Sequence, residues 1–285
     1  FLVYFSEDKG IKGDISMKLE VKHLTTGYGD TKIITDLNLT IPEGKVTALI
    51  GANGCGKSTL LKTICRIIPA MDGEILLDGK KITSYGSREL AKKIAILPQN
   101  PTAPGELTVR ELVMYGRAPH QGSIFARTTK EDRKMVDWAL EETGLTEFAN
   151  RNISQMSGGQ RQRAWIAMAI AQNADILFLD EPTSFLDVAH QMDVLHLVEH
   201  LNKTYNKTVV MVIHELNEAA RFADYLVAMR DGQIQYEGTS YEIFHNEMLS
   251  NVFGVDSTIM NDPKTNRPFC IPYSTKSYGN LGREV

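Results

Sequence analysis

The stretch Gly51-Ala-Asn-Gly-Cys-Gly-Lys57-Ser58 decides the fold class. It directly follows residues 46–50, a short and mostly apolar run that predicts a strand, and it precedes Leu60, Leu61 and Ile64, which recur at helical spacing. Strand, loop and helix in this order satisfy the pattern GxxxxGK[ST], in which successive backbone N–H groups curl around phosphate oxygens. The sequence therefore predicts a phosphate-binding loop at the edge of an α/β sheet.

The residues of this loop have distinct expected roles in holding ATP. We expect Lys57 to reach the β and γ phosphates, Ser58 to ligate Mg²⁺ and Thr59 to support the α phosphate, while the helix N-terminus faces the anion. The loop itself would be lined by Gly51, Asn53, Gly54, Cys55 and Gly56. A glycine-rich turn that only opens a helix is the alternative, and Cys55 is interpreted as a small packing residue, not a redox group.

A second motif, Ile176-Leu-Phe-Leu-Asp180-Glu181, ends an apolar strand with two adjacent carboxylates. Ligands of open α/β sheets bind at the carboxyl ends of the strands. Asp180 is the candidate Mg²⁺ ligand, and Glu181 is the candidate general base for the attacking water. A solvated carboxylate pair is the alternative, and the phosphate-binding loop upstream favours the catalytic interpretation.

The distribution of apolar residues outside these two motifs predicts how the chain is organised. Continuous apolar runs at 176–179, 209–213 and 226–229 are typical of buried parallel strands, whereas the alternation in residues 19–21 and 37–41 favours half-buried antiparallel strands. Residues 100–164 show helical stretches and no convincing strand, which indicates a helical insertion. We also expect the helix after the loop to include Ile67 and Ile68 and to stop at Pro69.

Composition excludes several classes of protein. The chain has 285 residues, a net charge of −4 and a pI near 6.0, which give no global attraction to nucleic acid. No apolar run approaches the ~20 residues of a spanning helix, and residues 1–5 are too short for an export signal. Three cysteines without paired spacing argue against disulfides and zinc and favour a reducing cytosol. Residues 1–16 are expected to be an extension outside the fold.

The segment Ser157-Gly-Gly-Gln-Arg161, between the loop and the carboxylates, resembles the signature sequence of ABC ATPases. The other family elements follow in family order over residues 17–255: Tyr28 resembles the adenine-stacking aromatic, Gln99 the Q-loop glutamine, Asp187 the D-loop aspartate and His214 the switch histidine. Met156, Phe185 and Glu215 depart from the usual pattern, and none removes a catalytic group.

The resemblance implies a RecA-like P-loop NTPase core with a mainly parallel sheet, an N-terminal antiparallel β subdomain and an inserted α-helical subdomain. It also implies a homodimer around two ATP molecules, in which Ser157, Gly158, Gly159 and Gln160 of one copy close over the ATP of the other, and it implies that Asp187 belongs to the nucleotide-binding residues. Gln99 and His214 would act beside Glu181, with Gln99 also near Mg²⁺. Integral membrane permease subunits and, indirectly, a substrate-binding protein would be the further partners.

Several residues keep a simpler interpretation. Without the family, Tyr28 is an ordinary turn aromatic, Gln99 a strand cap and His214 a satisfied strand-end histidine. His196 and His200 are four residues apart, but Leu197 stands where HExxH requires glutamate, so a polar helix face is favoured over a metal site.

The transported compound is a finer hypothesis. The segments 115–122 and 186–191, and a probable β-hairpin in the tail 256–285, resemble those of ATPases that serve importers of ferric siderophores, with cobalamin and haem importers as alternatives. A surface hairpin without a role in specificity is the alternative for the tail. A non-transport ABC ATPase is the less favoured class, because no long coiled-coil insertion or second cassette is present. The expected location is cytoplasmic, peripheral on the membrane through the permease.

Overall fold

The structure, a computed structural model, describes residues 18–103, 106–121 and 128–275. The expected extension 1–16, the end of the tail after Thr275, and Gly122 of the segment 115–122 lie outside the described residues. The strands are β1 (Leu19–Tyr28), β2 (Thr31–Ile41), β3 (Val46–Gly51), β4 (Asp72–Leu77), β5 (Lys80–Lys81), β6 (Ile94–Leu97), β7 (Ile176–Asp180), β8 (Thr208–Val212), β9 (Tyr225–Arg230), β10 (Gln233–Gly238), β11 (Val255–Asn261) and β12 (Pro268–Thr275). The helices are α1 (Lys57–Ile64), α2 (Ser87–Ala91), α3 (Val109–Tyr115), α4 (Lys130–Glu142), α5 (Gly158–Ala171), α6 (Val188–Tyr205), α7 (Leu216–Phe222), α8 (Ser240–Ile243) and α9 (Asn246–Phe253).

A six-stranded sheet forms the centre of the molecule, in the order β10-β9-β3-β8-β7-β6. The neighbours from β9 to β6 are parallel, and β10 is antiparallel to β9. Every residue of β3, β7 and β8 is buried, because both faces of the sheet are covered. The alternation along β7 divides its side chains between two cores: Leu177 and Leu179 belong to one, Ile176 and Phe178 to the other.

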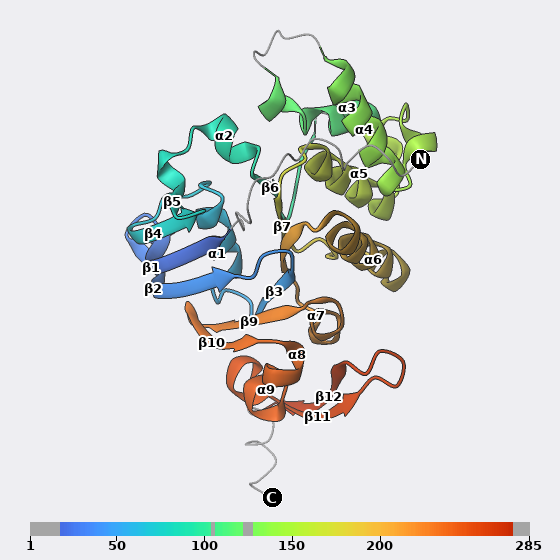
Figure 1. Ribbon diagram of the computed structural model, residues 1–285. Coiled ribbons are helices and arrows are strands. Elements are labelled where there is room, and N and C mark those ends of the chain that lie inside the picture. Colours follow the sequence, from blue (N-terminus) through green and yellow to red (C-terminus); the bar gives the residue numbers. More distant parts are fainter. Residues whose placement is uncertain (1–17, 104–105, 122–127, 276–285) are drawn as a thin grey trace, which may run out of the picture.

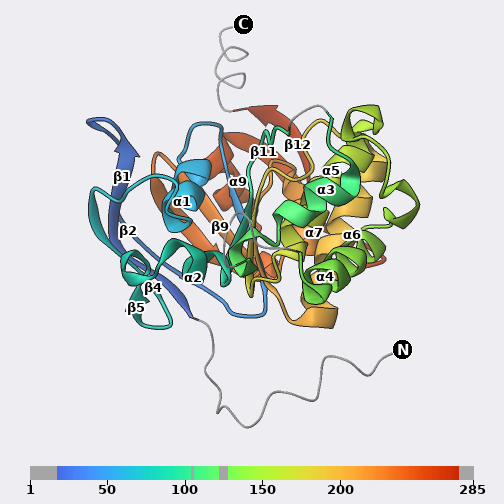
Figure 2. The same ribbon diagram turned by 90° about the horizontal axis from the view of Figure 1, so that it is seen from above.

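The second layer is an antiparallel sheet at the start of the chain, in the order β2-β1-β4-β5. Val21 pairs with Leu39 and Leu24 with Leu37, so the alternating apolar residues of both strands face the same core as α1. Figures 1 and 2 show this sheet in blue on one side of the central sheet, and the green helices α3 and α4 on the other. The mainly parallel core, the antiparallel sheet and the helical layer confirm the expected α/β fold class.

The helical layer is built from α3, α4 and α5. Each of these helices starts with a capping box, at Thr108, Thr129 and Ser157 respectively, in which the cap hydroxyl and a side chain three residues later satisfy each other's backbone N–H groups. The buried ion pair between Arg117 and Asp132, with Nε and Oδ1 3.0 Å apart, joins the chain after α3 to the first turn of α4. Caps made by residues close in the sequence thus start all three helices, and the buried ion pair also holds the start of α4.

Helix α1 is shorter than the sequence predicts. It ends at Ile64, so the expectation that Ile67 and Ile68 continue it to Pro69 is wrong. Arg66 has a left-handed backbone (φ 58°), and its guanidinium donates to the carbonyls of Ile82 and Tyr85. Both carbonyls belong to the chain that follows β5, so the residues after Ile64 contact this segment instead of extending α1.

The described part of the tail forms an antiparallel hairpin of β11 and β12, in which Ile259 pairs with Cys270. Cys270 is buried, and the hairpin lies next to α7 and α9 at the end of the molecule farthest from α3 and α4 (Figure 1). Among the residues that the structure describes, no helix is long and apolar enough to cross a membrane.

Candidate functional site

The phosphate-binding loop lies between β3 and α1, where the central strand ends. Its glycines are required by the backbone: Gly51, Gly54 and Gly56 all have positive φ angles, and a Cβ on Gly51 would come within 2.2 Å of the Met229 carbonyl oxygen. Lys57 is buried, and its Nζ donates to the carbonyls of Gly51 (2.8 Å) and Ala52 (3.0 Å). Through these two bonds, the lysine spans its own loop.

The first turn of α1 is open to an anion. Its N-cap residue is Gly56, which has no side chain to accept from the first helical N–H groups, and no acidic residue lies in the first turn. Helix N-termini leave such donors unpaired and carry a partial positive charge. Loop, helix start and Lys57 thus form a cradle for phosphate groups.

Asp180 and Ser58 fit the requirements of a Mg²⁺ ion. The Ser58 Oγ donates to Asp180 Oδ1 at 2.8 Å, whereas Asp180 Oδ2 is buried and has no hydrogen-bond partner. Burial, together with the neighbouring Glu181 carboxylate, raises the pKa of Asp180 against the opposing bond from Ser58. A buried carboxylate oxygen without a partner, beside a hydroxyl, is the kind of oxygen donor set that a divalent cation satisfies. The structure thus brings Ser58 and Asp180 within hydrogen-bond distance of each other, and their binding of Mg²⁺ stays a prediction.

Glu181 lies at the centre of a hydrogen-bond network. Its Oε1 is 2.6 Å from His214 Nε2, and its Oε2 accepts from Gln99 Nε2 at 2.6 Å and from Ser184 Oγ at 2.8 Å. The residue has a left-handed backbone (φ 55°), a conformation that a side chain with a Cβ rarely adopts. Residues from three separate strand ends thus meet at one carboxylate.

This network keeps Glu181 ionised. Burial alone would raise the pKa of the carboxyl group, but the bonds from His214, Ser184 and Gln99 outweigh it and hold the pKa below its usual value. An ionised carboxylate can accept a proton from water. The geometry therefore supports Glu181 as the base, with Gln99 and His214 as the groups that orient it.

The signature segment begins α5. Ser157 and Gln160 form its capping box, with Ser157 N donating to Gln160 Oε1 (3.1 Å) and Gln160 N donating to Ser157 Oγ (3.2 Å). Gly159 lies against the ring of His190, whose Cδ2 a Cβ on Gly159 would approach to 2.2 Å. His190 in turn contacts the D-loop carboxylate, since its Nδ1 lies 2.7 Å from Asp187 Oδ1. Signature and D-loop are thus joined within one chain.

The Q-loop, the signature helix and Glu181 surround a common cavity of about 360 Å³. Its lining includes Gln99, Gly158, Glu181 and Phe185. Phe185 is 90% exposed and has a positive φ of 64°, so a large apolar side chain is held out of the protein beside this cavity. Tyr28 is also exposed, at the end of β1.

Two residues at the site were not predicted from the sequence. Ser184 supports Glu181, and His190 supports Asp187; each stands three residues after the carboxylate that it contacts. A hydrogen-bonding residue at i+3 could have pointed to them, but this spacing is common at turns and helix starts.

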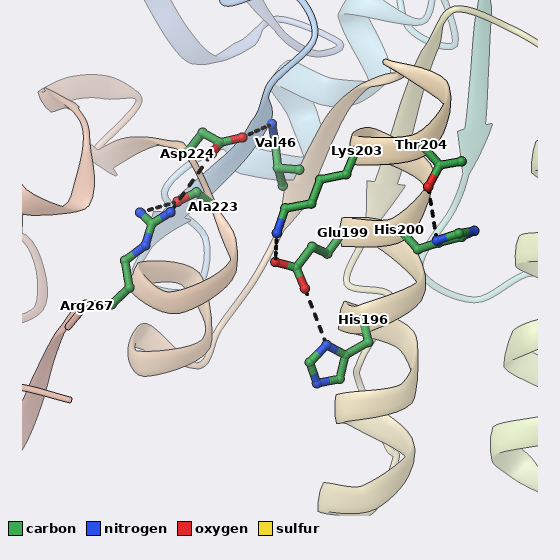
Figure 3. A network of polar contacts seen from close by, with 9 residues as sticks. All are labelled: Val46, His196, Glu199, His200, Lys203, Thr204, Ala223, Asp224 and Arg267. Carbon is green, nitrogen blue, oxygen red and sulfur yellow. Dashed lines mark hydrogen bonds and ion pairs between the residues drawn. The ribbon is translucent and has the colours of Figure 1, made fainter. Parts of the chain in front are cut away.

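His196 and His200 make polar contacts along α6. His196 contacts Glu199, which also accepts from Lys203, and His200 contacts Thr204 (Figure 3). Over the described ranges, no group of three His, Cys, Asp or Glu side chains is arranged to hold a metal ion.

The fold and site define the class of this protein. A P-loop after a central parallel strand, a carboxylate pair on the strand two positions away, and a signature segment at the start of α5 are the arrangement of an ABC-type ATPase. The model of the ABC transporter family matches residues 34–184. The chain belongs to this family, whose domain binds ATP and ADP.

Curated relatives agree with this class over almost their whole length. The chain is 52% identical to the iron(3+)-hydroxamate import ATP-binding protein FhuC of Bacillus subtilis, with 90% of this chain and 94% of the relative covered. It is 45% identical to the ferric enterobactin transport ATP-binding protein FepC of Escherichia coli over 90% and 94% of the two chains.

Solved structures show the same fold. An inward-facing metal-chelate type ABC transporter matches with a TM-score of 0.79 at 30% identity, covering 91% of this chain and 98% of that one. A dimeric ATP-binding cassette bound to ADP and phosphate matches with a TM-score of 0.66 at 32% identity, covering 78% and 98%.

Proposed function

We propose that this chain is the ATPase that powers a binding-protein-dependent importer of ferric siderophores, with ferric hydroxamates as the first candidates. The ATPase activity in this proposal is supported by the network around Glu181, where His214, Gln99 and Ser184 contact one ionised carboxylate beside a cradle for phosphates. The names of the relatives support the substrate part.

In this proposal, ATP binding rearranges the groups that line the site. Lys57 leaves the carbonyls of Gly51 and Ala52 for the β and γ phosphates. Asp180 Oδ2 and Ser58 would hold Mg²⁺, which neutralises charge on the phosphates when bound. The exposed aromatic face of Tyr28 takes the adenine.

Glu181 then acts as general base. Both of its oxygens have partners in the structure, His214 on one side and Gln99 and Ser184 on the other. The γ phosphate attracts the His214 side chain, which frees Oε1 to accept the proton of the attacking water, while Gln99 orients that water. Hydrolysis thus depends on the same three side chains that restrain the base beforehand.

Closure around ATP requires a second copy of the chain. The N–H groups at the start of α5 and the Ser157 hydroxyl lie on a different element from the phosphate-binding loop, and in the dimer they contact the γ phosphate held by the partner copy. Because these contacts are lost with the phosphate, ATP favours the closed dimer and ADP the open one. This difference drives the permease, to which the chain binds from the cytoplasmic side, and a substrate-binding protein delivers the cargo.

A deletion strain tests the substrate. Uptake of labelled ferric hydroxamate, ferric catecholate siderophore, cobalamin and haem is compared in the deletion strain and after complementation with the wild-type chain or Glu181→Gln. We expect siderophore uptake to be lost, to return with the wild type and to stay absent with Glu181→Gln. Unchanged siderophore uptake with lost cobalamin or haem uptake would assign the chain to those importers, and no transport defect, with no membrane subunit co-purifying, would favour a non-transport ATPase.

The role of Gln99 in coupling has its own test. Its side chain contacts Glu181, and it lies directly before residues 100–103 of the path that leads to the helical layer. We expect Gln99→Ala to leave ATP affinity nearly unchanged and to hydrolyse ATP without matching uptake, because movement at the site no longer reaches that layer. Normal uptake per ATP hydrolysed in this variant would contradict the coupling role.

A further inference from the structure

The C-terminal hairpin contacts both ends of the helix that follows the switch histidine. His214 precedes α7 by two residues, and α7 is short, spanning only Leu216–Phe222. Its N-cap residue, Glu215, makes no capping hydrogen bond with its side chain. Short helices have little stability of their own and depend on tertiary contacts. The position of His214 therefore depends on what holds α7.

At the start of α7, Asn217 pairs with the hairpin backbone. Its Oδ1 accepts from Cys270 N at 2.8 Å, and its Nδ2 donates to the Cys270 carbonyl at 3.1 Å. This reciprocal pair uses both sides of one carboxamide, so it fixes the orientation as well as the distance of α7 relative to β12. Cys270 is 2% exposed and belongs to the same core as Ala219 and Phe222 of α7.

At the end of α7, the side chain of Arg267 also joins the hairpin to the helix. Its guanidinium donates to the carbonyl of Ala223, the residue that ends α7, at 3.2 Å, and to Ser240 Oγ at 3.2 Å. Its Nη2 also lies 4.0 Å from Asp224 Oδ1, and Asp224 accepts from the N–H of Val46 at the start of β3 (Figure 3). Through Arg267 and Asp224, the hairpin is thus connected to the strand that leads into the phosphate-binding loop.

We propose that Asn217 and Arg267 are positioning residues through which the C-terminal hairpin holds α7 and keeps His214 within hydrogen-bond distance of Glu181. The 2.6 Å contact between His214 Nε2 and Glu181 Oε1 is the geometry that depends on this support. The inference rests on the proposed function of His214 and extends it: the hairpin, which lies outside the matched residues 34–184, becomes part of the catalytic apparatus.

The kinetic test uses the full-length chain together with the membrane subunits that co-purify with it. We expect Asn217→Ala to lower kcat for ATP about 10- to 100-fold, the effect of misplacing a catalytic group by roughly 1 Å. The KM for ATP should stay within about twofold, because the phosphate-binding loop is unchanged. Arg267→Lys keeps the charge but loses the fork of the guanidinium, and should change kcat in the same direction.

The matched control is Ser257→Ala. The Ser257 hydroxyl joins the same hairpin to Asn246 of α9 at 3.3 Å and has no bond to α7. Its loss should leave kcat unchanged. If the hairpin only stabilised the fold, the three variants would instead change kcat by similar amounts, or kcat and KM would change together.

A spectroscopic measurement separates positioning from general damage. The imidazole resonances of His214, assigned through His214→Ala, should shift in Asn217→Ala and in Arg267→Lys but not in Ser257→Ala. If Asn217→Ala fails to fold, Arg267→Lys decides on the same measurements. Wild-type kcat in the folded variants, or a lower kcat with unchanged His214 resonances, overturns the inference. Wild-type turnover in His214→Ala would instead overturn the proposed role of the histidine itself.

Discussion

Replacing Asp132 tests how the helical layer is held in place. Asp132 and Arg117 are both almost fully buried, and among the residues that the structure describes Arg117 has one further bond, from its Nη1 to the carbonyl of Ala171 at 2.8 Å. Asp132 Oδ2 also accepts from the N–H and hydroxyl of Thr129, which starts α4. Asp132→Ala removes the bonds of Asp132 with Arg117 and Thr129, and it leaves the guanidinium charge buried with the carbonyl of Ala171.

The expected loss is large compared with the stability of an ordinary domain. Removing one partner of a buried ion pair costs about 3–5 kcal/mol, out of a total free energy of unfolding of about 5–15 kcal/mol. For domains of about 150–250 residues, 1 kcal/mol corresponds to about 2–4 °C, so we expect the midpoint of thermal unfolding to fall by about 6–20 °C.

The matched control lies on the same helix. Asp137 and Arg110 are 2.6 Å apart, but both are exposed, so Asp137→Ala should cost about 0–1 kcal/mol. Thermal unfolding of the three proteins at pH 7, followed by circular dichroism, compares the two carboxylates. Unfolding midpoints of Asp132→Ala and Asp137→Ala within 2 °C of each other would refute the reasoning from burial. That threshold is about half of the smallest difference in midpoint that we expect between the two variants.

The same carboxylate has a defined pH dependence. Burial would raise the pKa of Asp132, but the bonds from Thr129 and Arg117 outweigh it and lower the pKa. A group with a lower pKa in the folded state stabilises the protein above its unfolded pKa of about 3.9, and this contribution is lost as the pH falls through the folded value. The difference between wild type and Asp132→Ala should therefore shrink below about pH 4.

Three further predictions concern catalysis, assembly and packing. Glu181→Gln should lower turnover about 10²- to 10⁴-fold with ATP binding retained, and a wild-type rate in the presence of the permease would contradict its role as base. In that background, ATP but not ADP should shift the chain from monomer to dimer in sedimentation, and Ser157→Arg should abolish the shift without weakening ATP binding by the monomer; equal dimerisation in ATP and ADP would count against a composite site. Gly116→Ala should lower the free energy of unfolding, measured in urea, by about 1–3 kcal/mol or more, because its Cβ would lie 2.0 Å from the Met168 carbonyl oxygen. Gly86→Ala, with open space around the Cβ, should change it by no more than about 0.5 kcal/mol. Similar changes for the two variants would be inconsistent with the steric argument.

The sequence by itself determined the elements that depend on residues close together in the chain. A glycine-rich loop between an apolar strand and a helix has few alternatives, because only glycine accepts the backbone angles of Gly51 and Gly56 without strain. The apolar runs around 176–179 and 209–213 could only be strands covered on both faces. The phosphate cradle and the pair of Asp180 and Glu181 were therefore predictable from spacing.

Only the tertiary structure decided the rest, since it depends on residues far apart in the chain. Helix α1 ends at Ile64, and Arg66 beyond it contacts carbonyls of another layer, although the apolar pattern continues. The bonds from Gln99 to Glu181 and from Asn217 to Cys270 span 82 and 53 residues. Periodicity reports which face of an element is buried, but it carries no information on which distant side chain meets that face. That choice is made when the sheet brings its strand ends together and the hairpin closes on α7.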